Sequence, residues 1–332
     1  MHALEQEAEA IRFEDVVALA REDMAAVDAL ITASLASDVA LVSQVSEYIV
    51  RSGGKRLRPM IVLLAAGALE YDGDDHYQAA AIIEFIHTAT LLHDDVVDAS
   101  ERRRGRDSAN AVFGNQASVL VGDFLYSRAF QMMVGIDSMR VMEILADATN
   151  TIAAGEVMQL MNVHDPDVTE EEYRQVIYRK TARLFEAGAR IAAVLAGSSA
   201  ATEDAMAEYG RHLGCAFQLV DDALDFDASA EELGKNLGDD LAEGKPTLPL
   251  IYAMETGSEE ERMIIRDAIE RGGRDRFARI SRVIESTGAL QYTAARAQEA
   301  ADSAIDALAD LPESDYRQAL VAIADFAVRR RS

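Results

Sequence analysis

Apolar residues along this chain recur mostly at the three- and four-residue spacing of amphipathic helices, and they rarely alternate as they do in strands. Helical patterning covers 13–50 with a break at 34–38, and the nearly continuous apolar run at 60–69 predicts a buried helix. Further helices are expected at 79–98, 117–134 and 138–161, from 170, up to 226, and from 258 onward. The pattern therefore predicts an all-α fold.

The breaks between these segments carry helix-start and loop signals. Thr169 with Glu172, and Ser258 with Glu261, each match a capping box, in which two side chains satisfy free N–H groups at a helix start. Loops are predicted at 51–59, 100–110 and 229–246. Because no Pro/Ser-rich linker divides the chain, we expect one domain over residues 1–332.

The composition of the chain limits the kinds of ligand that it can bind. The 332 residues carry a net charge of −26, which argues against nucleic acid, since its binding needs Lys and Arg to neutralise phosphates. The same charge disfavours a polybasic membrane anchor, and no apolar run approaches the roughly 18 residues of a membrane span. An anionic ligand would therefore need a local basic cluster or bound metal ions.

Cysteine usage and the N-terminal sequence indicate the compartment. Cys215 is the single cysteine, so no internal disulfide can form, and its apolar surroundings predict an inert buried thiol. The acidic N-terminal stretch has no apolar core of the kind that a signal peptide needs. We expect a cytoplasmic protein.

Two stretches share the pattern DDxxD, namely DDVVD at 94–98 and DDALD at 221–225. Positions i and i+4 of a helix share a face, so Asp94 and Asp98 point together, with Asp95 flanking them. Carboxylates are the hard oxygen ligands that Mg²⁺ takes together with substrate phosphates. The candidate metal ligands are Asp94, Asp95, Asp98, Asp221, Asp222 and Asp225.

The alternative without a binding function is that both motifs are acidic helix ends facing solvent. It explains neither the apolar run before each motif nor the basic residues after it. The chain also has 28 arginines but only four lysines, which all lie in motif-like contexts: GGKRLRP, YRKTA, LGKN and EGKPTLP. An ammonium is a compact charge suited to phosphate oxygens. The contexts of these lysines therefore indicate a diphosphate ligand, and not four lysines left by chance in an arginine-biased chain.

Together these motifs resemble the trans-polyprenyl diphosphate synthases over essentially the whole chain, most closely the branch that makes octaprenyl diphosphate for the ubiquinone side chain. The resemblance implies an all-α bundle around a deep central cavity, usually a homodimer, with both aspartate motifs binding an allylic diphosphate through Mg²⁺. It also implies head-to-tail addition of isopentenyl diphosphate to a farnesyl-type primer, by attack of its double bond on an allylic cation.

The resemblance assigns roles to basic and polar residues. Lys55, Arg58, His87 and Arg104 match positions that hold isopentenyl diphosphate, and Arg103 matches one that contacts the allylic diphosphate. Lys180, Thr181 and Gln218 match residues that line the reaction centre, and Lys235 and Lys245 match the lysines of a mobile lid. Taken without this context, His87 would more often be a satisfied core histidine.

Three other basic features are interpreted as structural. Arg102 is surface charge in this interpretation, because the family motif needs only two of the three arginines at 102–104. His93 has no assigned role. The arginines at 329–331 are interpreted as a solvated tail, with a tail that folds over the active site as the alternative.

Small residues one turn before Asp94 bear on product length. Ala89 and Thr90 lie there, and relatives that make short products plug their cavity with bulky residues at these positions. An open cavity is therefore expected, with a C40 product preferred and C35, C45 and C50 left open. Candidates for a deeper floor are Met132, Met133 and Leu145, although methionines on a buried helix are more often core filler.

Three rival functions would leave traces in the sequence. A terpene cyclase usually replaces the second aspartate motif and does not need the residues for isopentenyl diphosphate. A shorter-chain synthase would carry bulky residues near Ala89, and a non-catalytic helical partner subunit would have lost aspartates or basic ligands. The sequence keeps both aspartate motifs and the residues for isopentenyl diphosphate and has small residues at 89–90, which favours long-chain elongation.

Overall fold

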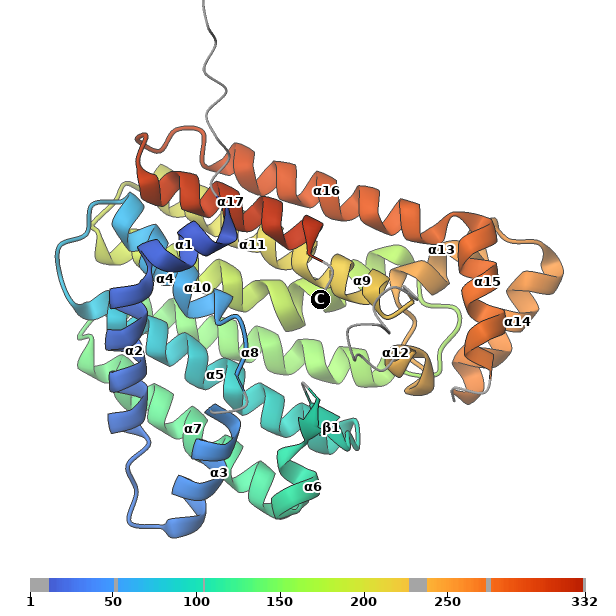
Figure 1. The fold of residues 1–332 in the computed structure, drawn as a ribbon, viewed down its shortest axis with the longest axis horizontal. Helices are drawn as coiled ribbons and strands as arrows, with labels where there is room; N and C mark the ends of the chain where they lie inside the picture. The colour runs from blue at the N-terminus through green and yellow to red at the C-terminus, as the bar shows by residue number, and fades with distance from the viewer. Residues whose placement is uncertain (1–11, 51–52, 104, 227–237, 273–275, 331–332) are drawn as a thin grey trace, which may run out of the picture.

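A computed structural model describes residues 12–50, 53–103, 105–226, 238–272 and 276–330 (Figure 1). The all-α prediction is confirmed, since the strands in these residues amount to one short antiparallel pair. The elements are α1 (Phe13–Leu19), α2 (Arg21–Ser34), α3 (Ala40–Val50), α4 (Leu57–Ala68), α5 (Asp75–Val97), β1 (Arg102–Arg103), β2 (Arg106–Asp107), α6 (Ala109–Phe113), α7 (Asn115–Gly135), α8 (Met139–Asn162), α9 (Glu170–Ile177), the π-helix η1 (Tyr178–Ala182), α10 (Arg183–Leu195), α11 (Ala200–Leu224), α12 (Asp239–Ala242), α13 (Leu248–Thr256), α14 (Glu259–Arg271), α15 (Phe277–Thr287), α16 (Ala289–Ala307) and α17 (Asp315–Arg329).

The long helices are stacked roughly along the longest axis of the molecule, with α13–α15 grouped at one end (Figure 1). Helix α5 packs against α7 and α4, while α11 packs against α10 and α16. Both aspartate motifs lie at the C-terminal ends of their helices, toward the side where β1 and α12 lie. Among the described residues, none of the helices combines the length and apolarity needed to span a bilayer.

Two glycines let α11 approach the chain at η1 and α10 very closely. A Cβ atom on Gly210 would lie 2.5 Å from the carbonyl oxygen of Phe185, and one on Gly214 would lie 2.4 Å from the Cα of Ala182. Any larger residue would push the two helices apart. This close contact brings Gln218, one turn further along α11, beside η1.

Local signals predicted the helix starts well. Both capping boxes form, with Thr169 and Ser258 each accepting from the backbone N–H three residues on. Two predicted loops are only partly irregular: 100–110 contains the β1–β2 pair and the start of α6, and 239–242 forms α12. The predicted break after α2 is confirmed, and a second break at Ala20 was not predicted.

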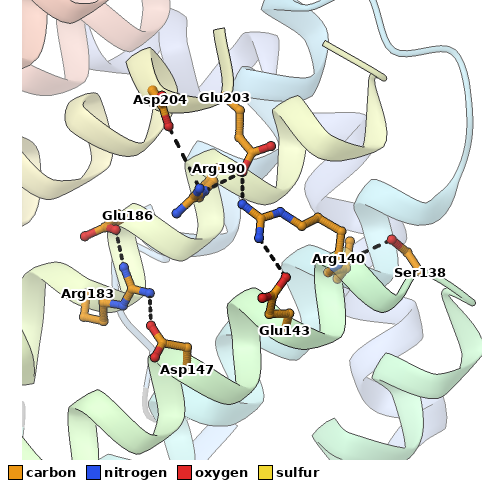
Figure 2. A network of polar contacts seen from close by, with 10 residues as sticks. Ser138, Arg140, Glu143, Asp147, Arg183, Glu186, Arg190, Glu203 and Asp204 are labelled. Atoms are coloured by element: carbon orange, nitrogen blue, oxygen red, sulfur yellow. Dashed lines mark hydrogen bonds and ion pairs between the residues drawn. The ribbon is translucent and has the colours of Figure 1, made fainter. Parts of the chain in front are cut away.

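A network of arginines and carboxylates joins α8, α10 and α11 away from the aspartate motifs (Figure 2). Arg140 on α8 and Arg190 on α10 both donate to Oε1 of Glu203 on α11, at 2.6 and 2.7 Å. Arg183 is buried and donates to Glu186 and Asp147. These contacts hold the helices on which the site is built in a defined arrangement.

Candidate active site

The first aspartate motif lies at the C-terminal end of α5, where its carboxylates divide into two groups. The side chains of Asp94 and Asp98 remain partly exposed, at 16% and 21%, and each faces a lysine ammonium. Asp95 is fully buried on another side of the helix, where its Oδ1 accepts from Nε and Nη2 of Arg103, both at 2.7 Å. Burial raises the pKa of Asp95 although Arg103 lowers it.

The second motif, at the end of α11, is divided in the same way. Asp222 is buried, and its two oxygens accept from Tyr173 Oη at 2.5 Å and Gln218 Nε2 at 2.7 Å. Asp225 accepts from the backbone N–H groups of Asp239 and Asp240, at 3.1 and 3.3 Å. Burial raises the pKa of Asp222 strongly and that of Asp225 to about 8, and the neighbouring Asp240 carboxylate adds to both shifts.

Asp221 opens the second motif and is 47% exposed. Its Oδ1 lies 3.4 Å from Nη2 of Arg330, which also donates to the carbonyl oxygen of Phe217 at 2.8 Å. The Arg330 guanidinium stacks over the Phe217 ring, and its side chain is only 5% exposed. The solvated-tail interpretation is therefore wrong for Arg330, because α17 carries it to the end of α11, whereas Arg329 is exposed and Arg331 lies outside the described residues.

Lysines from two distant segments reach the first motif. Lys180 Nζ lies 3.4 Å from Oδ2 of Asp94, and Lys245 Nζ lies 2.9 Å from Oδ2 of Asp98. Burial lowers the pKa of both ammonium groups, but the surrounding carboxylates outweigh it and the net shift is upward. Both lysines are therefore held as cations at the mouth of the motif.

Lys180 and Thr181 lie in η1, a wide turn inserted between α9 and α10. Such π-helical turns occur mostly as single interruptions of α-helices and are frequent at functional sites. Thr181 Oγ1 donates to Gln218 Oε1 at 2.8 Å, and Gln218 in turn donates to Asp222. The structure thus brings the three residues predicted for the reaction centre, Lys180, Thr181 and Gln218, to one place.

A cavity of about 130 Å³ opens between η1, α11 and the segment that follows α12. Its lining includes Lys180, Thr181, Gln218, Asp222, Asp240 and Lys245. Two lysines and two aspartates are among the lining residues, a mixture that suits an anionic ligand bridged by cations.

Two of the residues predicted to hold isopentenyl diphosphate, Arg58 and His87, contact each other. Arg58 Nη1 is 3.2 Å from His87 Nε2, and its guanidinium stacks on the Phe185 ring at 4.4 Å. His87 and Arg103 line a second cavity of about 20 Å³. Lys55 lies over the Phe326 ring of α17, with 4.9 Å from its Nζ to the ring centre. Arg104 and Lys235 lie outside the described residues.

Most of the residues proposed to limit product length belong to the buried core that includes α5. Ala89, Met133 and Leu145 are fully buried in one apolar cluster that also holds Met132. Thr90 is partly buried, and its hydroxyl donates to the carbonyl oxygen of His87 at 2.7 Å. Neither of the two cavities described above is lined by these residues, so their role as a ruler stays a prediction.

Two basic residues interpreted as structural lie outside both cavities. Arg102 is exposed and donates to the carbonyl oxygen of Gly105 at 2.8 Å. His93 packs on α7, where its Nε2 lies 3.3 Å from the carbonyl oxygen of Val119 and 3.4 Å from Asp123.

Four acidic or phenolic residues at the site were not singled out from the sequence. Glu156 and Glu243 pair with the two lysines, Tyr173 hydrogen-bonds Asp222, and Asp240 lines the larger cavity. Burial raises the pKa of Glu156 to about 7, although Lys180 opposes the shift. The sequence offered signals for two of them, since Asp240 belongs to an acidic pair at 239–240 and Glu243 directly precedes GKP, whereas Glu156 and Tyr173 have the spacing of ordinary helix residues.

Comparison with known proteins accords with this geometry. The family model described as polyprenyl synthetase matches residues 39–286. Octaprenyl diphosphate synthase of Escherichia coli (strain K12) is 55% identical over 321 residues, covering 96% of this chain and 99% of that protein. All-trans-nonaprenyl-diphosphate synthase (geranyl-diphosphate specific) of Rhodobacter capsulatus is 48% identical over 318 residues, covering 96% and 98%.

A solved structure shares the fold over nearly the whole length. The crystal structure of polyprenyl synthase from Caulobacter crescentus CB15, complexed with calcium and isoprenyl diphosphate, superposes with a TM-score of 0.93 at 47% identity, covering 98% of this chain and 99% of that one. Asp94 and Asp98 face two lysines that line one cavity together with Asp222, and with this geometry the likenesses lead to one conclusion. The chain belongs to the polyprenyl synthetase family and is a prenyltransferase that synthesises long-chain trans-prenyl diphosphates.

Proposed function

We propose that this enzyme extends a farnesyl-type allylic diphosphate with isopentenyl diphosphate to all-trans octaprenyl diphosphate (C40), within one domain over residues 1–332. One observation carries the proposal: the hydrogen-bonded residues Thr181, Gln218 and Asp222 line the same cavity as the two lysines that face Asp94 and Asp98. The C40 length is supported by the name of the 55% identical relative, and the 48% identical nonaprenyl relative makes C45 the nearest alternative.

The residues present fit Mg²⁺. Asp94 and Asp98 already attract cations, as their contacts with the two ammonium groups show, and carboxylate oxygens are the ligands that Mg²⁺ prefers. In the described residues no three acidic, histidine or cysteine side chains form a metal site by themselves. We infer that Asp94, Asp98 and Asp221 would face the ions, while Asp95 and Asp222 hold neighbouring groups in place.

Bound Mg²⁺ would supply electrostatic stabilisation to the departing diphosphate. We expect the chain's own cations Lys180, Lys245 and Arg103 to add to this stabilisation by binding diphosphate oxygens. Asp95 accepts a hydrogen bond from the Arg103 guanidinium and would hold it in position. The C–O bond of the allylic diphosphate breaks, and the double bond of isopentenyl diphosphate attacks the resulting cation. The dipoles of Thr181 and Gln218 line the cavity at this point and stabilise that positive charge.

The second substrate, isopentenyl diphosphate, is proposed to bind at a separate group of basic residues. Lys55, Arg58 and His87, with Arg104, are proposed to hold the diphosphate of isopentenyl diphosphate, and the contact between Arg58 and His87 supports a shared site. After the new C–C bond forms, a proton leaves for the released pyrophosphate, so no side-chain nucleophile is required.

We further propose a homodimer built on α7 and α8, whose outer faces expose an unusual number of large apolar side chains. They are Val119, Leu120, Phe130, Val134, Val157, Leu160 and Met161. A cytoplasmic location fits the single free thiol of Cys215, and supply of a ubiquinone side chain rests on the resemblance to the octaprenyl branch.

The test is a product assay with purified protein, isopentenyl diphosphate, farnesyl diphosphate and Mg²⁺, read by mass spectrometry. A C40 diphosphate is expected, and Asp94→Ala should abolish it while the exposed Glu143→Gln should not. A product that stops at C20 would contradict the length but not the chemistry. No condensation by the wild type would favour a non-catalytic subunit.

A further inference from the structure

Glu156 on α8 contacts the site without belonging to either aspartate motif. Its Oε2 lies 2.6 Å from Lys180 Nζ, closer than the 3.4 Å between that ammonium and Asp94. Its side chain is 29% exposed. The mechanism above gives Glu156 no role, yet it is the nearer of these two counter-ions of Lys180.

The approach of α8 to η1 depends on the residue before Glu156. A Cβ atom on Gly155 would lie 2.7 Å from the Cβ of Arg179 and 2.9 Å from the backbone nitrogen of Lys180. The missing side chain therefore allows the two backbones to touch. Glu156 then projects from the next position and reaches the end of the lysine.

Lys180 needs such a tether, because lysine has a flexible four-carbon stem that loses much rotamer freedom when its ammonium is held in one place. Asp94 alone is a poor anchor for it, since the proposed function gives the Asp94 oxygens to a metal ion. A parallel arrangement exists at Lys245, which pairs with Asp98 at 2.9 Å and with Glu243 at 2.5 Å. In both cases a glutamate outside the motifs provides the second contact.

We propose that Glu156 is a positioning residue that holds the Lys180 ammonium at the edge of the larger cavity when Asp94 engages a metal ion. The inference rests on the proposed function and deepens it. Glu156 acts through Lys180 and touches neither substrate. Its removal should therefore slow the reaction only while Lys180 is present.

The kinetic test measures kcat and KM for both substrates in Glu156→Gln, Lys180→Ala and the double variant. Glu156→Gln should lower kcat about tenfold, as expected for a displaced catalytic group, and leave the KM for isopentenyl diphosphate nearly unchanged. In the Lys180→Ala background, Glu156→Gln should lower kcat by less than about twofold. Glu156→Asp, which keeps the charge on a shorter stem, should restore part of the rate. Glu143→Gln on the same helix, 69% exposed, is the matched control.

A second measurement needs neither metal nor turnover. Because the chain has only four lysines, reductive ¹³C-methylation gives few NMR signals, and that of Lys180 is identified by its loss in Lys180→Ala. In metal-free protein this signal should shift in Glu156→Gln and stay in place in Glu143→Gln.

The outcomes separate the two proposals. The role of Glu156 is overturned if kcat is unchanged in Glu156→Gln, or if Glu156→Gln lowers kcat equally with and without Lys180. It is also overturned if the NMR signal of Lys180 does not shift. Wild-type protein that makes no product overturns the proposed function, and the NMR signal then decides alone whether Glu156 positions Lys180.

Discussion

In each aspartate motif, the middle carboxylate is buried and holds neighbouring side chains of the site in place. Asp95 binds Arg103, and Asp222 accepts from Tyr173 and Gln218. Adjacent residues on a helix point about 100° apart, so the sequence already places Asp95 away from the face of Asp94. Its partner could not be predicted, because Arg103 reaches it only through the turn made by β1 and β2.

Cys215 gives a prediction for a single residue. Burial raises the pKa of its thiol from 9.0 to about 11, so at pH 8 the thiolate fraction is about a hundredfold below that of the unfolded chain. Reaction with a thiol-specific disulfide reagent at pH 8 should be slower by about this factor in native protein than in guanidinium chloride. Rapid stoichiometric reaction of the native enzyme would contradict the inert-thiol interpretation.

Among the helices, the network around Glu203 joins α8, α10 and α11 (Figure 2). The sequence predicts each of these helices separately but does not predict that they pack together. The hydrogen bonds from Arg140 and Arg190 join α8 and α10 to the first turn of α11. The helices themselves follow from local apolar spacing. Their pairing depends on side chains that meet across 13 and 63 residues of chain, which no local pattern encodes.

This network gives a pH-dependent prediction for stability. Burial tends to raise the pKa of Glu203, but the bonds from Arg140 and Arg190 lower it below 4.5. A folded pKa below the unfolded value means that the stabilisation is present above pH 4.5 and is lost as the pH falls through the folded pKa. Glu203→Gln should lower the free energy of unfolding by about 1 kcal/mol at pH 7, which corresponds to about 2 °C in Tm.

The check is thermal unfolding at pH 7 and at pH 3.5, with Glu260→Gln as the control. Glu260 is 78% exposed and has one arginine contact at 3.3 Å, so its change should have little effect at either pH. The deficit of Glu203→Gln should shrink at the lower pH. A deficit that is constant with pH would mean that the ion pairs do not cause it.

For the whole molecule, function depends on bringing cations to an acidic surface. The chain carries a net charge of −26, yet Lys180, Lys245 and Arg330 all gather at the ends of α5 and α11. The charge alone excluded nucleic acid but could not indicate where anions bind. That depends on contacts such as Lys245 with Asp98, whose residues lie 147 positions apart.

The proposed homodimer gives a prediction for the assembly. Leu120 on α7 is 65% exposed, and a charge at this position should disrupt an apolar interface between two copies. Light scattering should give about twice the 36.1 kDa chain mass for the wild type, and Leu120→Glu should lower it toward one chain. Met263→Glu, at a 59% exposed position on α14, should leave the mass unchanged. A monomeric wild type would contradict the proposal.

The sequence by itself determined the all-α class, most helix positions, the capping boxes and the shared face of Asp94 and Asp98, because each depends on spacing within a few turns. Only the tertiary structure decided which motif residues face the cavity, that Arg330 lies at Asp221, and that Glu156 reaches Lys180. The physical reason is that these contacts join distant segments. They form only where close backbone approach, as at Gly155 and Gly214, and burial bring those segments together.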